Sequence, residues 1–185
     1  MFSIRTDLAV EAKEICEKKI GSNIPGVEIE EKMEENIKVT YVNIVEDVGE
    51  KFMGKPKGSY ITIDMPEFTH YDGDMRDKVS MVMGKVLSGV INVDGSMTAM
   101  VVGLGNWNIT PDALGPKTAS KLMVTRHLKE LVPDKIDEGI RPVCVISPGV
   151  LGITGIETGE IIKGVVDKIK PNIIVCIDAL ASRKM

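Results

Sequence analysis

The sequence predicts an α/β fold with a mostly parallel sheet and helices on both of its faces. From about residue 58 onward, short apolar strands rich in β-branched residues alternate with amphipathic helices. The helical stretches are long enough to serve as the crossovers that parallel strands need. We therefore expect a single domain, with a core at residues 58–185 and an N-terminal helix and β-hairpin at residues 1–57.

The N-terminal third predicts a helix followed by an antiparallel hairpin. Apolar residues recur at helical spacing over residues 6–19. Two segments, 27–31 and 37–45, read as strands because apolar and polar residues alternate along the second one, which suits a sheet with one wet face. The following stretch, 49–58, combines lysines with glycine and proline, so we expect a mobile, solvated loop there.

The predicted core consists of alternating strands and helices. The strands are expected at residues 60–64, 98–102, 143–147 and 173–177. The helices are expected at residues 74–90, 115–131 and 157–170, and the first of them has an apolar face made of Val79, Val82, Met83, Val86, Leu87 and Val90.

Three segments follow the carboxyl ends of these strands, where α/β sheets gather their ligands. They are residues 103–116, 147–158 and 178–182. Two of them contain an aspartate next to the strand end or to a helix start, namely Asp112 and Asp178. Either residue alone suits a helix cap or a turn. Together they place two carboxylates on one rim of the sheet.

Two neighbouring carboxylates provide a route to hydrolysis. At about 4 Å and an effective dielectric constant near 20, their repulsion costs about 4 kcal/mol, which raises the pKa of one of them by roughly three. One proton is then shared, so that one group can activate water while the other protonates the leaving group. The same pair could instead hold a divalent metal ion.

Other residues on this rim are candidates for supporting roles. Gly105 and Asn106 form the turn after a strand, where the backbone can approach a ligand closely. Gly149 and Gly152 belong to a glycine-rich loop that could cradle an oxyanion or a peptide backbone. Glu157 could tune the aspartates as a third acid, although a capping role at the N-terminus of the next helix is the favoured explanation.

The composition excludes several functional classes. The net charge is −4, aromatic residues make up 4%, and no basic stripe is present, so we expect no nucleic-acid partner. No apolar run is long enough to cross a membrane, and the start does not resemble a signal peptide, which predicts a cytoplasmic protein. Three cysteines without regular spacing predict buried, reduced thiols.

We expect neither an organic cofactor nor a metal ion. The Gly103-Leu104-Gly105 turn lacks the third glycine of a dinucleotide-binding loop, because Asn108 stands in its place. His127 lies beside charged residues in a predicted helix and His70 lies in a predicted loop, so neither is a strong candidate for catalysis.

Long segments of the sequence resemble the germination proteases of endospore-forming bacteria. The resemblance rests on four segments that extend over essentially the whole chain: Arg5–Glu11, Gly103–Pro116, Ser147–Glu160 and Asp178–Arg183. It implies an atypical aspartic endopeptidase with Asp112 and Asp178 as the catalytic pair. It also implies a core similar to that of the hydrogenase maturation peptidases, a phosphorylase- and hydrolase-like α/β fold.

The resemblance further implies a biological setting. Members of this family degrade small acid-soluble spore proteins during germination, in the cytoplasm of the forespore or spore core. They are made as zymogens and assemble as homotetramers. Family chains are considerably longer, so we expect this chain to be truncated at its C-terminus, and its start at Met1 to lie near that of the mature form.

Alternatives from other classes remain open at this point. The chain could be a non-catalytic fragment of the protease whose loops hold a peptide, or a metal-dependent hydrolase on the same fold. Residues 101–106 also look like the start of a peptidyl-tRNA hydrolase, but the histidine that such enzymes need soon after the strand is absent, because Trp107, Asn108 and Ile109 follow.

Overall fold

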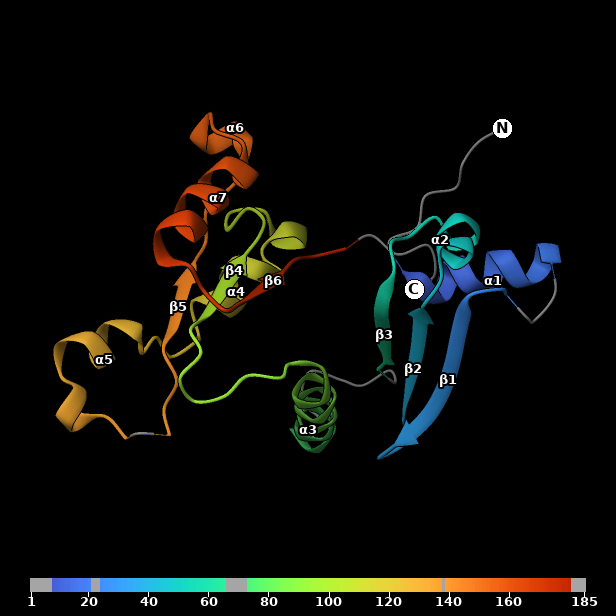
Figure 1. The fold of residues 1–185 in the computed structure, drawn as a ribbon, viewed down its shortest axis with the longest axis horizontal. Helices are drawn as coiled ribbons and strands as arrows, with labels where there is room; N and C mark the ends of the chain where they lie inside the picture. The colour runs from blue at the N-terminus through green and yellow to red at the C-terminus, as the bar shows by residue number, and fades with distance from the viewer. Residues whose placement is uncertain (1–7, 21–23, 66–72, 138, 181–185) are drawn as a thin grey trace. The chain divides into compact units, whose positions relative to one another are not determined.

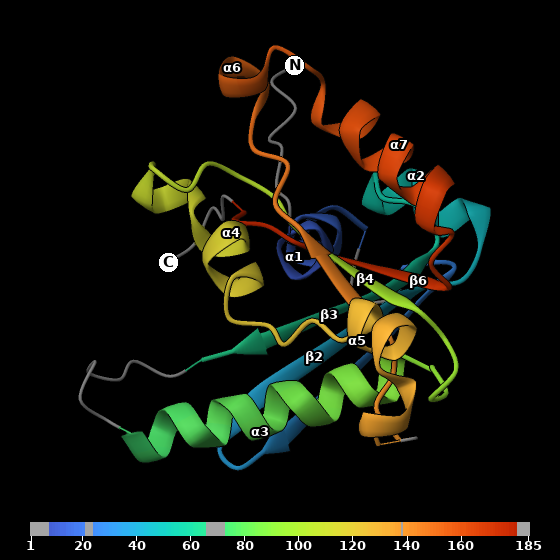
Figure 2. The same ribbon diagram turned by 90° about the vertical axis from the view of Figure 1, so that its left-hand side faces the viewer.

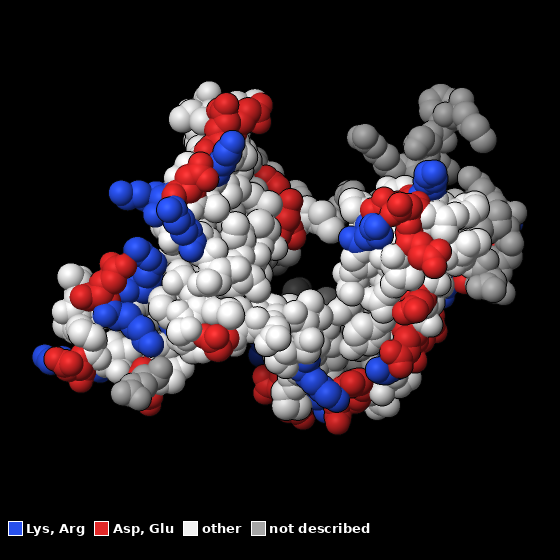
Figure 3. Space-filling model, viewed as in Figure 1, with Lys and Arg blue, Asp and Glu red and all other residues white. Residues whose placement is uncertain are grey.

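The computed structural model describes residues 8–20, 24–65, 73–137 and 139–180. The chain divides into two compact units at Ile91 and Asn92 (Figure 1). Unit 1 contains the elements up to Ile91, and unit 2 contains residues Asn92–Leu180. On the face shown in Figure 3, acidic and basic side chains are interspersed over each unit.

Unit 1 is built on a three-stranded antiparallel sheet of order β1-β2-β3. Its strands are β1 (Val27–Glu34), β2 (Ile37–Ile44) and β3 (Gly58–Asp64). Glu34 pairs with Ile37 across a two-residue turn, and both turn residues, Glu35 and Asn36, have positive φ angles of 50° and 65°. Such left-handed pairs match the twist of a tight hairpin, so the predicted hairpin is confirmed.

Helices cover both faces of β2. On one face lie α1 (Ala9–Ile20) and α2 (Asp47–Met53), and on the other lies α3 (Gly73–Val90), which runs along the sheet in Figure 2. Side chains alternate between the two faces of a strand. Val42 and Ile44 therefore join the cluster around Ala9, Ala12, Ile24 and Met53, while Ile37 and Val39 join Val79, Val82 and Val86.

Unit 2 is built on a three-stranded parallel sheet of order β5-β4-β6. The strands are β4 (Ala99–Gly103), β5 (Val143–Ile146) and β6 (Ile173–Ile177), each within a residue or two of its prediction. Met100 and Val102 of the central strand are almost fully buried. The helices of this unit are α4 (Leu114–Ala119), α5 (Arg126–Leu131), α6 (Leu151–Thr154) and α7 (Thr158–Ile169), with short 3₁₀ turns η1 (Thr110–Asp112) and η2 (Pro133–Lys135).

The predicted α/β class is confirmed, but the expectation of a mostly parallel sheet is not. β3 pairs with β2 in antiparallel register, so the parallel sheet is limited to β4, β5 and β6. A short apolar strand has the same appearance in either kind of sheet, which is why its sequence placed β3 in the parallel core. The expected core at residues 58–185 thus differs from the division at Ile91 and Asn92.

Two predicted segments have a different local structure. The loop expected at 49–58 begins inside α2, whose C-cap residue Gly54 is in a left-handed conformation with φ 63°. Lys57 then fastens the loop, because its backbone N–H donates to Glu50 and its ammonium lies 2.6 Å from an Asp47 carboxylate oxygen. Local bonds therefore organise a stretch that its composition predicted to be mobile.

The single helix predicted at 115–131 is broken into α4 and α5. The break ends at Thr125, which is 3% exposed. Its hydroxyl donates to the Arg141 carbonyl (2.5 Å) and accepts from the Val143 N–H (2.9 Å), while its own N–H donates to the Val143 carbonyl. These bonds fasten the chain to the start of β5, which an unbroken helix could not do.

Some side chains that we expected to be buried, on α3 and at two cysteines, are more exposed in the structure. On α3, Met83, Leu87 and Val90 are 44%, 46% and 55% exposed, so only the Val79, Val82 and Val86 stripe is buried. Cys144 is half-buried, and burial raises the pKa of its thiol, whereas Cys176 on β6 is exposed rather than buried.

Among the described residues, no helix is long and apolar enough to cross a membrane.

Candidate functional site

The topology of unit 2 singles out one place on the sheet edge. β4 comes first in the chain and lies in the centre; the chain continues to β5 on one side and then to β6 on the other. This reversal makes a topological switch point between β4 and β6, and open α/β sheets bind ligands outside the carboxyl ends of the strands at such points. The segments that leave these two strands contain Asp112 and Asp178.

Asp112 is held by the loop that follows β4. The backbone N–H of Asn106 donates to the Asp112 carboxylate at 2.7 Å and also lies 3.0 Å from the Asp112 carbonyl oxygen. The Asn106 side chain in turn accepts a hydrogen bond from the Asn108 N–H. The half-buried Asp112 does not cap α4, because Ala113 occupies the N-cap position. Its carboxylate is therefore fixed by the turn that carries it.

Gly105 makes this turn possible. Its φ angle is +112°, which favours glycine. A Cβ atom there would lie 2.1 Å from the carbonyl oxygen of Asp112 and 3.1 Å from its carboxylate. Gly105 and Asn106, predicted as supporting residues, thus contact Asp112 through their backbones.

Asp178 directly follows β6 and is exposed. Its carboxylate accepts a hydrogen bond from the N–H of the next residue, Ala179, at 2.8 Å. The preceding residue, Ile177, accepts a hydrogen bond from the Leu104 N–H at 2.8 Å. This bond ties the strand end that precedes Asp178 to the loop that leads to Asp112.

Gly115 is the point where these segments meet, and sequence reasoning missed it. A Cβ atom on Gly115 would lie 2.2 Å from the Leu104 carbonyl oxygen and 2.3 Å from that of Ile177. Only a residue without a side chain lets the start of α4 approach both strand ends so closely. The structure therefore brings the Asp112 and Asp178 segments together at the switch point. A glycine in the first turn of a helix was the signal available in the sequence.

The loop after β5 lies at the same carboxyl edge of the sheet, because β5 is parallel to β4. Gly149 has a φ angle of 79°, and its carbonyl accepts a hydrogen bond from the Thr158 hydroxyl at 3.2 Å. Gly152 lies in α6 with open space around it. Glu157 occupies the N-cap position of α7, but its side chain makes no capping bond. Its exposed carboxylate remains available for another role.

Large apolar side chains are exposed on the two aspartate-bearing segments. Trp107 is 52% exposed. The others are Ile109, Leu114 and Leu180. In the part of the chain that the structure describes, no cluster of three or more His, Cys, Asp or Glu side chains could hold a metal ion. The carboxylates are thus accompanied by apolar surface.

The comparison with protein families decides the assignment of this chain. A family model described as germination protease matches residues 5–185. The chain belongs to the germination protease family. All three loops at the carboxyl edge of the parallel sheet fall within the matched range.

Curated germination proteases are similar to this chain over its whole length. The chain is 62% identical to one from Clostridium tetani and 61% identical to one from Clostridium perfringens, in each case over 100% of this chain and 57% of the relative. A germination protease from Bacillus mycoides is 42% identical over 100% of this chain and 51% of the relative. The chain therefore spans about half to three-fifths of the length of these relatives.

Proposed function

We propose that this member of the germination protease family is an endopeptidase that degrades small acid-soluble spore proteins during spore germination, in the cytoplasm of the spore core. The family match and the similarity to curated germination proteases support a protease that acts in germination. The observation that supports Asp112 and Asp178 as the site of the chemistry is the junction at Gly115, where the segments of both residues meet at the switch point of the parallel sheet.

The proposed reaction uses the two aspartates as a base and an acid. The ionised carboxylate takes a proton from a water molecule as the water oxygen bonds to the peptide carbonyl carbon. The protonated partner then gives its proton to the amide nitrogen as the carbon–nitrogen bond breaks, so one water is consumed and two chain ends form. The Asn106 N–H fixes the Asp112 carboxylate in place for this step.

Neighbouring groups have supporting roles in this proposal. The exposed apolar side chains at Trp107, Ile109 and Leu114 offer contacts for apolar residues of an extended protein substrate. The loop with Gly149 and Gly152 presents backbone N–H groups to the carbonyl oxygen that becomes negative during the reaction. Glu157 adds a negative charge at the same edge of the sheet.

The test compares cleavage by isosteric variants. The chain is extended to full length with the C-terminal part of the Clostridium tetani relative, because the chain alone spans about 57% of that protein. Asp112→Asn and Asp178→Asn should each lower the cleavage rate of a purified small acid-soluble spore protein by at least about 100-fold. The control is Asp167→Asn, which removes an exposed carboxylate from α7 and should leave the rate unchanged. Full cleavage by either active-site variant would refute the assignment.

The same assay separates the two alternatives. A metal-dependent hydrolase would lose activity in a chelator, whereas the aspartate pair would not. A non-catalytic fragment would bind the spore protein without cutting it, so the unextended chain is assayed in parallel.

We further propose a zymogen and a homotetramer for the full-length protein. Mass measurement of the extended chain in solution tests the assembly.

A further inference from the structure

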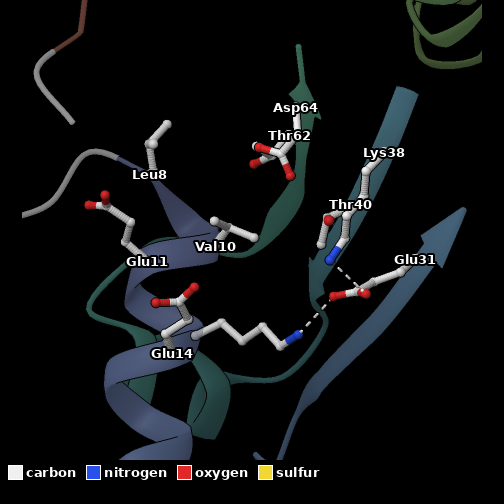
Figure 4. A pocket seen from close by; sticks show the side chains of 10 residues that line it. Leu8, Val10, Glu11, Glu14, Glu31, Lys38, Thr40, Thr62 and Asp64 are labelled. Atoms are coloured by element: carbon white, nitrogen blue, oxygen red, sulfur yellow. Dashed lines mark hydrogen bonds and ion pairs between the residues drawn. The ribbon is translucent and has the colours of Figure 1, made fainter. Parts of the chain in front are cut away.

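Unit 1 contains a cavity that the proposed protease chemistry does not use. It has a volume of about 200 Å³ and lies between α1 and one face of the antiparallel sheet (Figure 4). On this face, apolar β2 residues such as Val42 give way to Thr40 and Lys38 toward the start of the strand. Thr40 pairs with Glu31 and Thr62 on the neighbouring strands, and Lys38 pairs with Asp64. The interface between α1 and the sheet is therefore polar at this end.

The charged lining of the cavity favours a cation. Four carboxylates (Glu11, Glu14, Glu31 and Asp64) and two lysines (Lys13 and Lys38) line it, so the formal charge of the lining is −2. Both lysines pair with the same carboxylate, since their ammonium groups lie 3.3 Å and 2.9 Å from Glu31. The lysines are thus engaged with one acid while the net charge stays negative.

An independent sign of a ligand comes from Thr40. This residue is 0% exposed, and its hydroxyl has no hydrogen-bond partner among the residues that the structure describes. Buried hydroxyls without partners are rare in folded proteins, because the hydrogen bonds that they lose to water are not replaced. Figure 4 shows Thr40 on the wall of the cavity, next to Lys38 and opposite α1. A ligand that donates a hydrogen bond would satisfy this oxygen.

We propose that this cavity binds a guanidinium group, as carried by an arginine side chain. A guanidinium offers five N–H donors in a plane, which suits acceptors spread over a helix and several strands. The cavity is larger than a single ion needs, and Leu8 and Val10 line it with apolar surface for the methylene stem. Because the Thr40 hydroxyl is covered in this structure, the proposal requires the neighbouring Lys38 side chain, which is 43% exposed, to move aside when the ligand enters.

The test is a titration of the 185-residue chain with Nα-acetyl-arginine amide, in which binding is followed through the amide chemical shifts of the protein. The matched probe is Nα-acetyl-citrulline amide, which has nearly the same shape without the charge. Free L-arginine is a third probe, which distinguishes a site for the free amino acid's side chain from a site for an arginine within a peptide. Equal binding of both arginine compounds indicates recognition of the side chain alone, and tighter binding of the capped one indicates an arginine within a peptide.

Three variants sharpen the test. Asp64→Asn should weaken binding by about tenfold or more, the effect of one charge-assisted hydrogen bond. Thr40→Val should also weaken binding while raising the melting temperature of the free protein. Lys38→Met should tighten binding, because it removes a positive charge and opens the cavity. The control is Glu28→Gln on β1, which changes the charge equally on the opposite face of the sheet and should have no effect.

The proposal is overturned by equal binding of the citrulline probe, or by the absence of shifts at α1 and β2 with about 10 mM arginine amide, a concentration that saturates a site with a Kd near 1 mM. It is also overturned if Asp64→Asn binds like the parent protein. None of these outcomes bears on Asp112 and Asp178, since the proposal is independent of the protease function.

Discussion

Replacing Gly105 by alanine tests the backbone geometry that holds Asp112. The φ angle of +112° penalises any residue with a Cβ atom, at a cost of about 1–2 kcal/mol. The new methyl group would also overlap the Asp112 carbonyl oxygen at 2.1 Å, and overpacking of this kind costs about 1–3 kcal/mol. Together these effects should lower the free energy of unfolding by about 2–5 kcal/mol.

Urea unfolding followed by tryptophan fluorescence measures this change. Trp107 is the only tryptophan in the sequence and lies in the same loop, so its signal reports on unit 2. The matched control is Gly164→Ala in α7, where no atom lies within 4 Å of the new Cβ. This control should raise stability by about 0.5–1 kcal/mol. If Gly105→Ala unfolds like the parent, the loop does not hold Asp112 as described.

Three further changes test other parts of the structure. Gly115→Ala should destabilise unit 2 by about 1–3 kcal/mol and lower the cleavage rate, because its methyl group would push α4 away from Ile177. An unchanged free energy of unfolding would contradict the close approach of α4 to the strand ends at Gly115. Thr125→Val should lower the free energy of unfolding in urea by about 1–3 kcal/mol, since the Arg141 carbonyl and the Val143 N–H at the start of β5 lose their side-chain partner. Lys38 and Lys13 hold the pKa of Glu31 below its usual range. The ionised Glu31 carboxylate therefore adds to the free energy of unfolding at neutral pH, and this addition is lost as the pH falls through the lowered pKa. Because Glu31 is exposed, Glu31→Gln should reduce the pH dependence of stability by less than about 1 kcal/mol.

Local patterns in the sequence were sufficient for most of the elements. The hairpin turn at Glu35 and Asn36, the long helix α3 and the strands β4, β5 and β6 follow from periodicity and turn residues. The pairing of β3 with β2 did not follow, because neighbours within a sheet depend on contacts distant in the sequence. The break before α5 was missed for a similar reason, since Thr125 makes its bonds with residues at the start of β5.

The candidate site was predictable in part. The rule that ligands gather at the carboxyl ends of parallel strands pointed to the segments with Asp112 and Asp178, and the strand order places both beside the switch point. The bond from Asn106 to Asp112 and the close approach at Gly115 were not predictable, because they depend on backbone positions in three dimensions. The sharing of one proton by the two aspartates remains a prediction.

The central claim is that Asp112 and Asp178 act as one catalytic unit, and a double mutant tests it most directly. The measurement is kcat/KM for cleavage of a small acid-soluble spore protein by the extended chain with Asp112→Asn, Asp178→Asn and both changes together. Residues that act as a unit have strongly non-additive effects. We therefore predict that the double variant is no slower than the slower single variant. Losses that multiply in the double variant, or a single variant with parental activity, would contradict the account.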